Sequence, residues 1–194
     1  MLEVKNLSKT YEANGRRVEV IGDLSFSVQD KQFVVFVGPS GCGKTTFLKI
    51  AAGLLEPTSG DVLLDGKKII GPGQDRGMIF QNFTLFPWLT VRGNIGFGGT
   101  LREINPEEKN KIVEHYSHVT GLTEFADFYP KDLSGGMQQR AAIGRTLANN
   151  PKVLLMDEPF GSIDAQTRSQ MQEFLTKLWE TDHKTIVFVT HDVS

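Results

Sequence analysis

The stretch Gly38-Pro39-Ser40-Gly41-Cys42-Gly43-Lys44-Thr45-Thr46 decides the fold. It follows the apolar run 33–37 and precedes the mainly apolar segment 47–52, which predicts a buried strand, a glycine-rich turn and a helix. The pattern G-x-x-x-x-G-K-[ST] is complete in Gly38, Gly43, Lys44 and Thr45. Glycines let the backbone curl so that successive N–H groups point at phosphate oxygens, and the positive end of the following helix faces the same anion. We therefore predict that residues 38–46 bind a nucleoside triphosphate.

Two side chains of this stretch carry chemistry. Lys44 places a point charge near the terminal phosphates, and the Thr45 hydroxyl can bind Mg²⁺. The alternative is a glycine-rich turn with an accidental lysine. In a chain of this length, a chance match to the pattern is expected about once in a hundred sequences.

Composition excludes several other classes of protein. The chain has 194 residues, of which 39% are hydrophobic and 23% charged, as in a soluble domain that has at most one subdomain. The net charge is −2, whereas duplex binders are usually basic, so we expect no nucleic-acid partner. No run of eighteen apolar residues occurs, and we do not expect this chain itself to span a membrane.

The segments around the phosphate loop predict mostly strands. Segments 2–7, 18–21 and 24–28 are typical of an antiparallel sheet, and residues 8–15 are expected to form a loop. That loop carries Tyr11, which could either stack on adenine or pack at the sheet edge. Asp65-Gly66 predicts a type I′ turn between strands 61–64 and 67–70, and a buried strand over 77–80 ends at Gln81.

Residues 82–149 predict a helical insertion. It begins with an aromatic segment that contains Phe83, Phe86 and Trp88, which is either a satellite core or a surface for a partner. Asn105-Pro106 is typical of a helix start, and a short helix is expected over 122–129.

A further helix is expected to begin after Ser134 and to end near residue 149. Its first two residues, Gly135 and Gly136, each cost roughly 1 kcal/mol relative to alanine in a helix. This cost indicates close approach to the backbone, for which an anion is the natural candidate. The alternative is a loosely capped helix.

The last part of the chain predicts strand, helix and strand over 153–156, 166–180 and 185–190. Asp157 and Glu158 follow the first strand, and His191 follows the second. Ligands bind at the carboxyl ends of parallel strands, so we expect these side chains to converge with the Lys44 loop. Asp157 is a candidate Mg²⁺ ligand and Glu158 a candidate general base. The alternative for the two carboxylates is a solvated turn.

Taken together, these residues resemble the ATP-binding subunit of ABC transporters over essentially residues 1–194. The following segments carry the resemblance: Ser134-Gly135-Gly136 with Gln138, Gln139 and Arg140 (the ABC signature), Gln81 (the Q-loop), 153–159 (Walker B and the catalytic Glu), Ser162-Ile163-Asp164 (the D-loop, with Ile163 where Leu is more usual), His191 (the switch histidine) and Tyr11 (the adenine-stacking aromatic).

The resemblance implies an α/β fold. A P-loop NTPase core, similar to RecA, would have a mainly parallel sheet and an N-terminal antiparallel β subdomain, covering 1–81 and 150–194. An inserted α-helical subdomain would cover about 82–149. Family members usually continue past the switch histidine, so we expect the C-terminal part of the family to be missing here.

The resemblance also implies an ATPase in which two copies face each other head to tail and enclose two ATP molecules. It implies catalytic roles for Lys44, Gln81, Glu158 and His191, and Mg²⁺ ligation by Thr45, Gln81 and Asp157. The remaining nucleotide contacts would come from Tyr11, from residues 38–46, and, in the second copy, from Ser134, Gly135, Gly136, Gln138 and Asp164.

Segments 71–77 and 80–90 resemble the importers of nitrate, sulfonate, taurine and bicarbonate. This implies import of a small anion or sulfonate-type solute at the cytoplasmic face of the inner membrane. A membrane permease would contact Phe83, Phe86 and Trp88, and an extracytoplasmic solute-binding protein would belong to the same system.

Two alternative functions remain. An ABC ATPase for DNA repair or translation is disfavoured by the mildly acidic charge and the short segment between Gln81 and Ser134. In a P-loop kinase or GTPase, the Ser134 segment would have no role.

Overall fold

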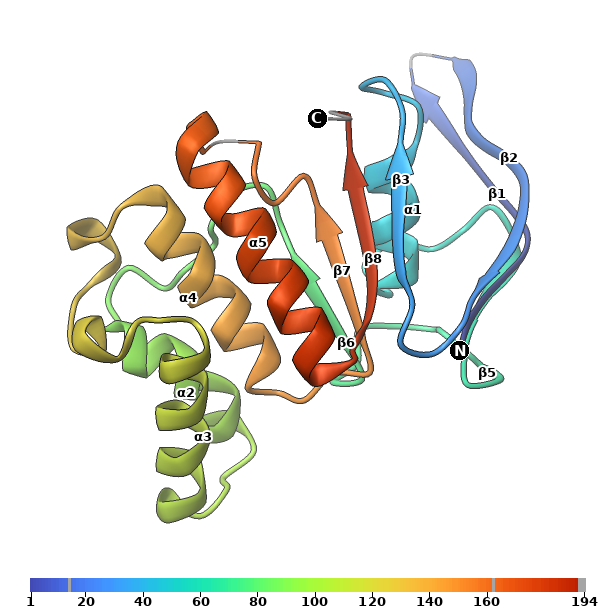
Figure 1. Ribbon diagram of the computed structural model, residues 1–194. Helices are drawn as coiled ribbons and strands as arrows, with labels where there is room; N and C mark the ends of the chain where they lie inside the picture. Colours follow the sequence, from blue (N-terminus) through green and yellow to red (C-terminus); the bar gives the residue numbers. More distant parts are fainter. Residues whose placement is uncertain (14, 162, 192–194) are drawn as a thin grey trace. The chain divides into compact units, whose positions relative to one another are not determined.

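The computed structural model describes residues 1–13, 15–161 and 163–191 (Figure 1). The chain divides into two compact units. The first unit contains Met1–Met78, Lys152–Glu158 and His183–Ser194. The second unit contains Ile79–Pro151 and Pro159–Asp182. Each unit is described by itself.

The first unit has an antiparallel sheet with the order β2-β1-β4-β5. Its strands are β1 (Leu2–Ala13), β2 (Arg16–Val28), β4 (Ser59–Leu64) and β5 (Lys67–Lys68). The long β1–β2 hairpin is drawn in dark blue in Figure 1. The antiparallel sheet that the sequence predicted before the phosphate loop is therefore present, and β4 and β5, which follow α1 in the chain, extend it to four strands.

The predicted loop over residues 8–15 is wrong for residues 8–13, because β1 runs through Tyr11 to Ala13. Gly15 does lie in a turn, and residue 14 lies outside the described residues. Segments 18–21 and 24–28 belong to one strand. The β1–β2 pairing shifts register several times between Val4 and Thr10, and Asn6 and Asp23 have left-handed φ values of 47° and 46°. These bulges interrupt the alternation of apolar and polar side chains, and for this reason the sequence looked like shorter, separate strands.

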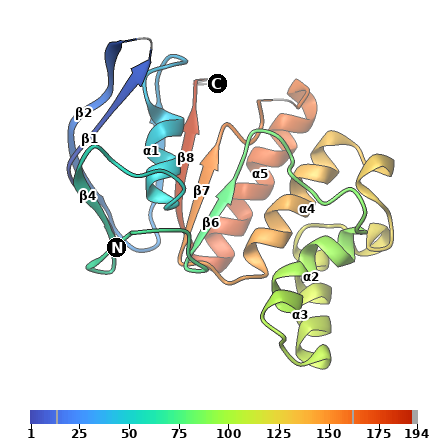
Figure 2. The same ribbon diagram turned by 180° about the vertical axis from the view of Figure 1, so that it is seen from behind.

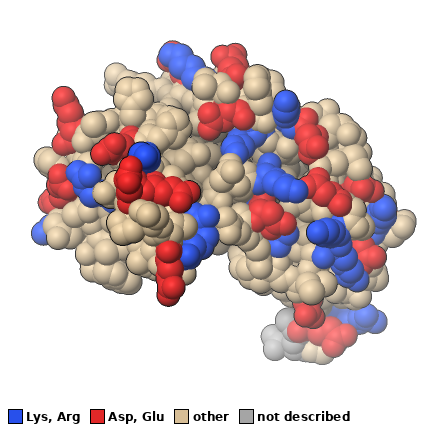
Figure 3. Space-filling model, turned by 90° about the horizontal axis from the view of Figure 1, so that it is seen from below, with Lys and Arg blue, Asp and Glu red and all other residues tan. Residues whose placement is uncertain are grey.

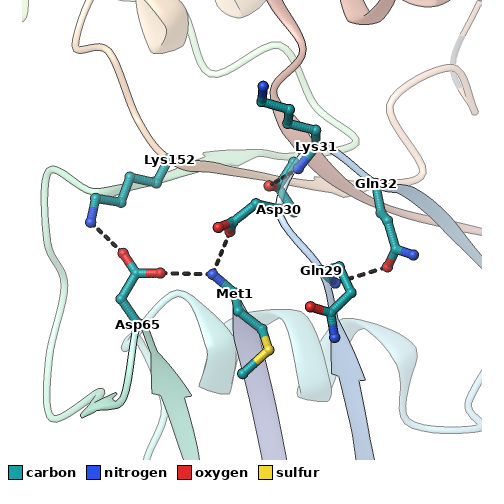
Figure 4. Close-up of polar contacts among 8 residues, drawn as sticks. Met1, Gln29, Asp30, Lys31, Gln32, Asp65 and Lys152 are labelled. Carbon is teal, nitrogen blue, oxygen red and sulfur yellow. Dashed lines mark hydrogen bonds and ion pairs between the residues drawn. The ribbon is translucent and has the colours of Figure 1, made fainter.

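The type I′ turn between β4 and β5 is confirmed, since Asp65 and Gly66 have φ values of 50° and 75°. The second strand is shorter than predicted and contains only Lys67–Lys68. Asp65 also binds charged groups, as Figure 4 shows: the Met1 ammonium lies 2.7 Å from one carboxylate oxygen, and Lys152 pairs with the other. The Met1 ammonium also contacts Asp30. The hydrogen bond from Lys152, followed by that from Met1, lowers the pKa of Asp65 to about 2.

The second sheet has the order β3-β8-β7-β6, and β8 is parallel to both β3 and β7. Its strands are β3 (Phe33–Val37), β6 (Arg76–Ile79), β7 (Val153–Asp157) and β8 (Thr185–Thr190). Figure 2 shows β7 between β8 and β6. Every residue of β7 is buried, which explains the apolar run over 153–156. Helix α1 (Lys44–Ala51) contacts β7, and the two share the core of the first unit.

The second unit is helical. It contains α2 (Val91–Leu101), α3 (Pro106–Val119), α4 (Gly135–Leu147) and α5 (Ala165–Asp182), together with 3₁₀ turns at Thr123–Phe125 and Pro130–Asp132. The predicted start of α3 is confirmed: Pro106 is its first residue, and the Asn105 side chain accepts a hydrogen bond from the Glu107 N–H. Its core consists of Val91, Ile95, Val113, Leu122, Leu133, Ala141 and Ala148.

The short helix predicted over 122–129 is wrong, since only a 3₁₀ turn forms there. The carbonyl groups of Ala126 and Phe128 instead accept hydrogen bonds from the first N–H groups of α2, at Arg92 and Val91. Pro130 also disfavours a helical conformation at the residue before it, and the backbone there is extended. The segment therefore caps α2 rather than forming a helix of its own.

Charged side chains of both signs are interspersed on the face shown in Figure 3. Within the described residues, no helix combines the length and the apolar character that a bilayer span requires.

Candidate functional site

Residues 38–43 form the turn between β3 and α1. Gly41 and Gly43 have φ values of 85° and 97°, which only glycine adopts readily. A Cβ atom at Gly43 would lie 2.6 Å from the Val20 carbonyl oxygen, so alanine does not fit there. Gly43 precedes α1 without a side-chain cap, and no acidic side chain lies in the first turn of α1. This helix start is therefore suited to an anion.

The Lys44 side chain folds back over this turn. Its Nζ atom donates to the carbonyl oxygens of Gly38 (2.5 Å) and Pro39 (2.9 Å), and it lies 3.7 Å from the Cys42 sulfur. The ammonium group is thus held within the loop whose N–H groups would bind phosphate. A polyanion would compete with two neutral carbonyl groups for it, and a charged partner forms the stronger hydrogen bond.

The Thr45 hydroxyl donates to an Asp157 carboxylate oxygen at 2.8 Å. Asp157 ends β7 and is only 7% exposed. Its pKa is raised, chiefly by burial and further by the Glu158 charge, whereas the hydrogen bond from Thr45 acts in the opposite direction. The site thus places a hydroxyl and a carboxylate oxygen side by side.

These two oxygens fit Mg²⁺, which prefers one or two carboxylates and takes its other ligands from phosphates and water. Among the residues that the structure describes, no cluster of three or more His, Cys, Asp or Glu side chains could hold a metal ion. The donor set at Thr45 and Asp157 thus suits a cation that arrives with a phosphate substrate.

Glu158 and His191 meet at the ends of the parallel strands β7 and β8. Nδ1 of His191 lies 2.7 Å from Oε2 of Glu158. Glu158 has a left-handed φ of 45°, and its N–H donates to the Val189 carbonyl oxygen at 2.9 Å. A carboxylate beside an imidazole can orient water and hold a proton.

Tyr11 lies within β1, opposite Val18, and is 40% exposed. The Lys9 ammonium lies 5.2 Å from its ring centre. Further along β2, Val20 approaches the phosphate loop at Gly43. Tyr11 therefore lies on β1, which pairs with β2, and β2 lies next to the phosphate loop.

The remaining candidates belong to the second unit. Ser134 caps α4, and its Oγ atom accepts a hydrogen bond from the Met137 N–H, as predicted. Gln138 donates to the Leu133 carbonyl oxygen at 3.1 Å. Asp164 accepts from the Thr167 N–H at the start of α5, and this hydrogen bond lowers its pKa.

The two glycines at the start of α4 have neighbours within the second unit. A Cβ atom at Gly136 would lie 2.4 Å from Cγ2 of Thr167, and one at Gly135 would lie 3.3 Å from the Phe83 ring. Close packing is therefore a sufficient reason for glycine at position 136.

The expected Q-loop and D-loop also belong to the second unit. Gln81 of the Q-loop is exposed, and Ser162 of the D-loop lies outside the described residues. Phe83 and Phe86 are half-buried, whereas Trp88 is 69% exposed.

Asn94 and Arg145 were not singled out from the sequence, yet both hold the segment that contains these aromatic residues. The available signal for Asn94 was a polar residue between the apolar Val91 and Ile95. The sequence carried no such signal for Arg145, since a charged side chain on a helix is usually exposed to solvent.

Lys44, Thr45, Asp157 and Glu158 thus surround the end of a parallel sheet at a glycine-rich turn and a helix start. This arrangement defines an α/β domain that binds nucleoside triphosphates. Comparison with known proteins gives the family: its model, described as ABC transporter, matches residues 21–161. The chain belongs to the ABC transporter family, in which it is an ATP-binding cassette and an ATPase.

Relatives span nearly the whole chain. An uncharacterized ABC transporter ATP-binding protein from Methanocaldococcus jannaschii is 52% identical over 192 residues, which are 99% of this chain and 72% of the relative. The taurine import ATP-binding protein of Roseobacter denitrificans is 47% identical and the nitrate import ATP-binding protein of Synechocystis is 45% identical, with the same coverage. A putative ATP-binding protein of Brucella abortus is 51% identical over 88% of this chain and 65% of its own length.

Solved structures agree with the family. The ATP-binding cassette MJ0796, in a dimeric post-hydrolysis state bound to ADP and Pi, matches with a TM-score of 0.87 and 35% identity. The match covers 100% of this chain and 89% of the other. The predicted fold class is therefore confirmed.

Proposed function

We propose that two copies of this chain bind and hydrolyse ATP and thereby drive import of a small anion or sulfonate-type solute through a membrane permease. The observation that carries the proposal is the phosphate loop itself, with Lys44 over it and the Thr45–Asp157 pair beside it. The nitrate and taurine importers among the relatives support the solute class.

The phosphate loop would hold the triphosphate through backbone N–H groups of residues 40–46. Lys44 would leave its carbonyl partners and neutralise charge on the β- and γ-phosphates, and Tyr11 would stack on the adenine. Thr45, Asp157 and Gln81 would hold Mg²⁺, which supplies positive charge to the phosphate oxygens.

Glu158 would accept a hydrogen bond from the attacking water and orient it toward the γ-phosphate. His191 would hold the Glu158 carboxylate and contact the γ-phosphate as well. Most of the rate enhancement would come from positioning and from electrostatic stabilisation, because phosphoryl transfer requires little covalent chemistry from the protein.

The second copy would complete the site. Its Ser134 and the first N–H groups of its α4 would face the γ-phosphate, assisted by Gly135, Gly136 and Gln138, and its Asp164 would connect the two copies. The absence of acidic residues from the first turn of α4 and the dimeric state of the related cassette support this arrangement.

A short helix of the permease would dock on Phe83, Phe86 and Trp88, and the chain would act at the cytoplasmic face of the inner membrane. Exposure of the Trp88 ring, which packs beside Phe86, supports this contact. An extracytoplasmic solute-binding protein would deliver the solute, as in import systems of the kind that the relatives are named for.

The test is MgATP hydrolysis by the purified chain. Lys44→Ala should reduce kcat/KM by at least about 100-fold, as loss of a group that stabilises transferred charge does. Lys67→Ala, an exposed lysine on β5, is the matched control and should keep normal turnover. Full turnover in Lys44→Ala would refute the site.

The import step needs the permease and the solute-binding protein together in proteoliposomes. ATP-dependent uptake of nitrate or taurine would support the solute class. Uptake of neither would refute that part of the proposal, and the ATPase result would stand.

A further inference from the structure

The segment 83–88, here named the aromatic loop, contains neither helix nor strand but has a fixed shape. Thr84 is in the left-handed region, with φ of 46°. The Phe86 ring lies 5.5 Å from the Trp88 ring and 4.4 Å from the Phe97 ring of α2, measured between centroids. Side chains from two helices account for this shape.

The first is Asn94 of α2, which is completely buried. Its Oδ1 atom accepts a hydrogen bond from the Phe86 N–H at 2.9 Å. Its Nδ2 atom lies within 3.0–3.2 Å of the carbonyl oxygens of Thr90, Leu89 and Phe86. The hydrogen bonds described for this buried amide thus all go to the end of the aromatic loop and the residues just after it.

The second is Arg145 of α4. Its two terminal nitrogens donate to the Thr84 carbonyl oxygen at 2.8 Å and to the Thr84 hydroxyl at 3.0 Å. The guanidinium carbon also lies 5.1 Å from the Phe86 ring centre, a cation–π distance. A lysine could not make this forked contact, because its charge sits on a single nitrogen.

Both ends of helix α4 therefore contact the aromatic loop. Near its C-terminal end, Arg145 binds Thr84, and at its start the Phe83 ring lies against Gly135. The helix start that contains Ser134 and the exposed Trp88 ring are thereby parts of one packed body.

We infer that Asn94 and Arg145 are positioning residues that fix the aromatic loop to α2 and α4, so that the partner surface moves together with the helix start that closes on ATP. This inference rests on the proposed function. It adds two residues that touch neither nucleotide nor permease but determine whether ATP binding reaches the permease surface.

The positioning itself is tested without nucleotide, by amide hydrogen exchange. The Phe86 N–H should exchange at least about tenfold faster in Asn94→Ala, because its only described acceptor is lost, while amides of α3 keep their protection. Unchanged exchange at Phe86 would overturn the inference. If Asn94→Ala does not fold, Arg145→Lys and Thr84→Val apply the same test at the other contact, with faster exchange expected throughout the aromatic loop.

Arg92→Lys is the matched control. Arg92 lies on α2 in the same unit, but its guanidinium binds the exposed Asp127 instead of the aromatic loop. It should leave exchange in the aromatic loop unchanged. Faster exchange in this control as well would show that the effect is general loosening of the unit, and would overturn the assignment to Arg145.

Transmission is tested by fluorescence in a Trp179→Phe, Glu158→Gln background, where Trp88 is the only tryptophan. MgATP should change Trp88 emission, and Arg145→Lys should reduce that change by at least about half while MgATP affinity stays within about threefold. A full response in Arg145→Lys would overturn the inference. Absence of MgATP binding in the background protein would refute the proposed function instead, and the exchange experiment would still decide the positioning.

Discussion

Nδ1 of His191 lies 2.7 Å from Oε2 of Glu158, and the two residues follow the adjacent parallel strands β8 and β7. The contact depends on an unusual backbone, because Glu158 has a left-handed φ of 45°. For a residue other than glycine this conformation costs about 1–2 kcal/mol. Strain of this kind persists where the surrounding structure fixes the backbone, and here the Glu158 N–H is held by Val189.

Replacement of Glu158 should therefore separate stability from activity. Glu158→Gly should raise the free energy of unfolding by about 1 kcal/mol, because glycine adopts φ of 45° without a penalty, and should abolish MgATP turnover. Glu158→Gln should lose turnover as well, but without this gain in stability. Urea unfolding and phosphate release measure both. Normal turnover in either variant would remove Glu158 as the base.

The Thr45–Asp157 hydrogen bond should be visible in the pKa of Asp157. Burial raises that pKa and Thr45 partly opposes the rise, so Thr45→Val should raise it further, whereas Thr45→Ser should leave it near the wild-type value. Carboxyl ¹³C titration of the nucleotide-free chain measures the shift. An equal or lower pKa in Thr45→Val would contradict the role of the hydrogen bond.

Because the pKa of Asp157 is raised, its contribution to the free energy of unfolding depends on pH. The folded state binds a proton at Asp157 more tightly than the unfolded state, so this group stabilises the fold below its ordinary pKa of 3.8. The contribution is lost as the pH rises through the higher folded-state pKa. Asp157→Asn should remove this part of the pH profile, which paired thermal scans would show.

Gly136 packs against Thr167, and this contact predicts that a smaller residue at position 167 restores stability lost by substitution of Gly136. Gly136→Ala should destabilise the chain by about 1–3 kcal/mol, because the new Cβ atom would lie 2.4 Å from Cγ2 of Thr167. Thr167→Ser removes that methyl group, so the double variant should regain most of the loss. Urea unfolding of the four proteins gives the coupling free energy. Additive losses would show that the two residues do not compete for space.

The hydrogen bond from Lys152 should keep the Asp65 carboxylate ionised to a lower pH. Its folded-state pKa of about 2 lies below the ordinary 3.8, so the carboxylate stabilises the fold above 3.8, and this contribution is lost as the pH falls through about 2. Lys152→Met should raise the Asp65 pKa, since it removes the largest cause of the shift. Unfolding monitored by circular dichroism should then begin at a higher pH, and Lys67→Met is a suitable control. Coincident acid transitions would contradict the assignment.

Strands β3, β7 and β8 and the phosphate-loop helix could be predicted because their apolar runs and glycines follow local rules. Helix α2 was not singled out, since it has four glycines that are unfavourable in a helix and are explained only by close neighbours. A Cβ atom at Gly98, for example, would lie 1.9 Å from the Asn149 side chain. The β1–β2 hairpin was misjudged because its bulges depend on pairing across the sheet.

The candidate site shows the same division. Residues that follow strand ends, such as Asp157, Glu158 and His191, could be predicted to converge, and the structure places Asp157 beside Thr45 and Glu158 beside His191. Asn94 and Arg145 act through the backbone of a loop without regular structure. The sequence signals Asn94 only as a polar residue between apolar ones and does not signal Arg145, so the three-dimensional arrangement is needed to identify the contacts that they make.

The central claim is that a triphosphate held by the Lys44 loop is completed by the Ser134 helix of a second copy. Light scattering of Glu158→Gln with MgATP tests it most directly. We expect the mass to double on addition of MgATP, and to remain that of one chain with MgADP or when Lys44→Ala is added. A single-chain mass at saturating MgATP, or doubling that persists in the Lys44→Ala variant, would contradict the account.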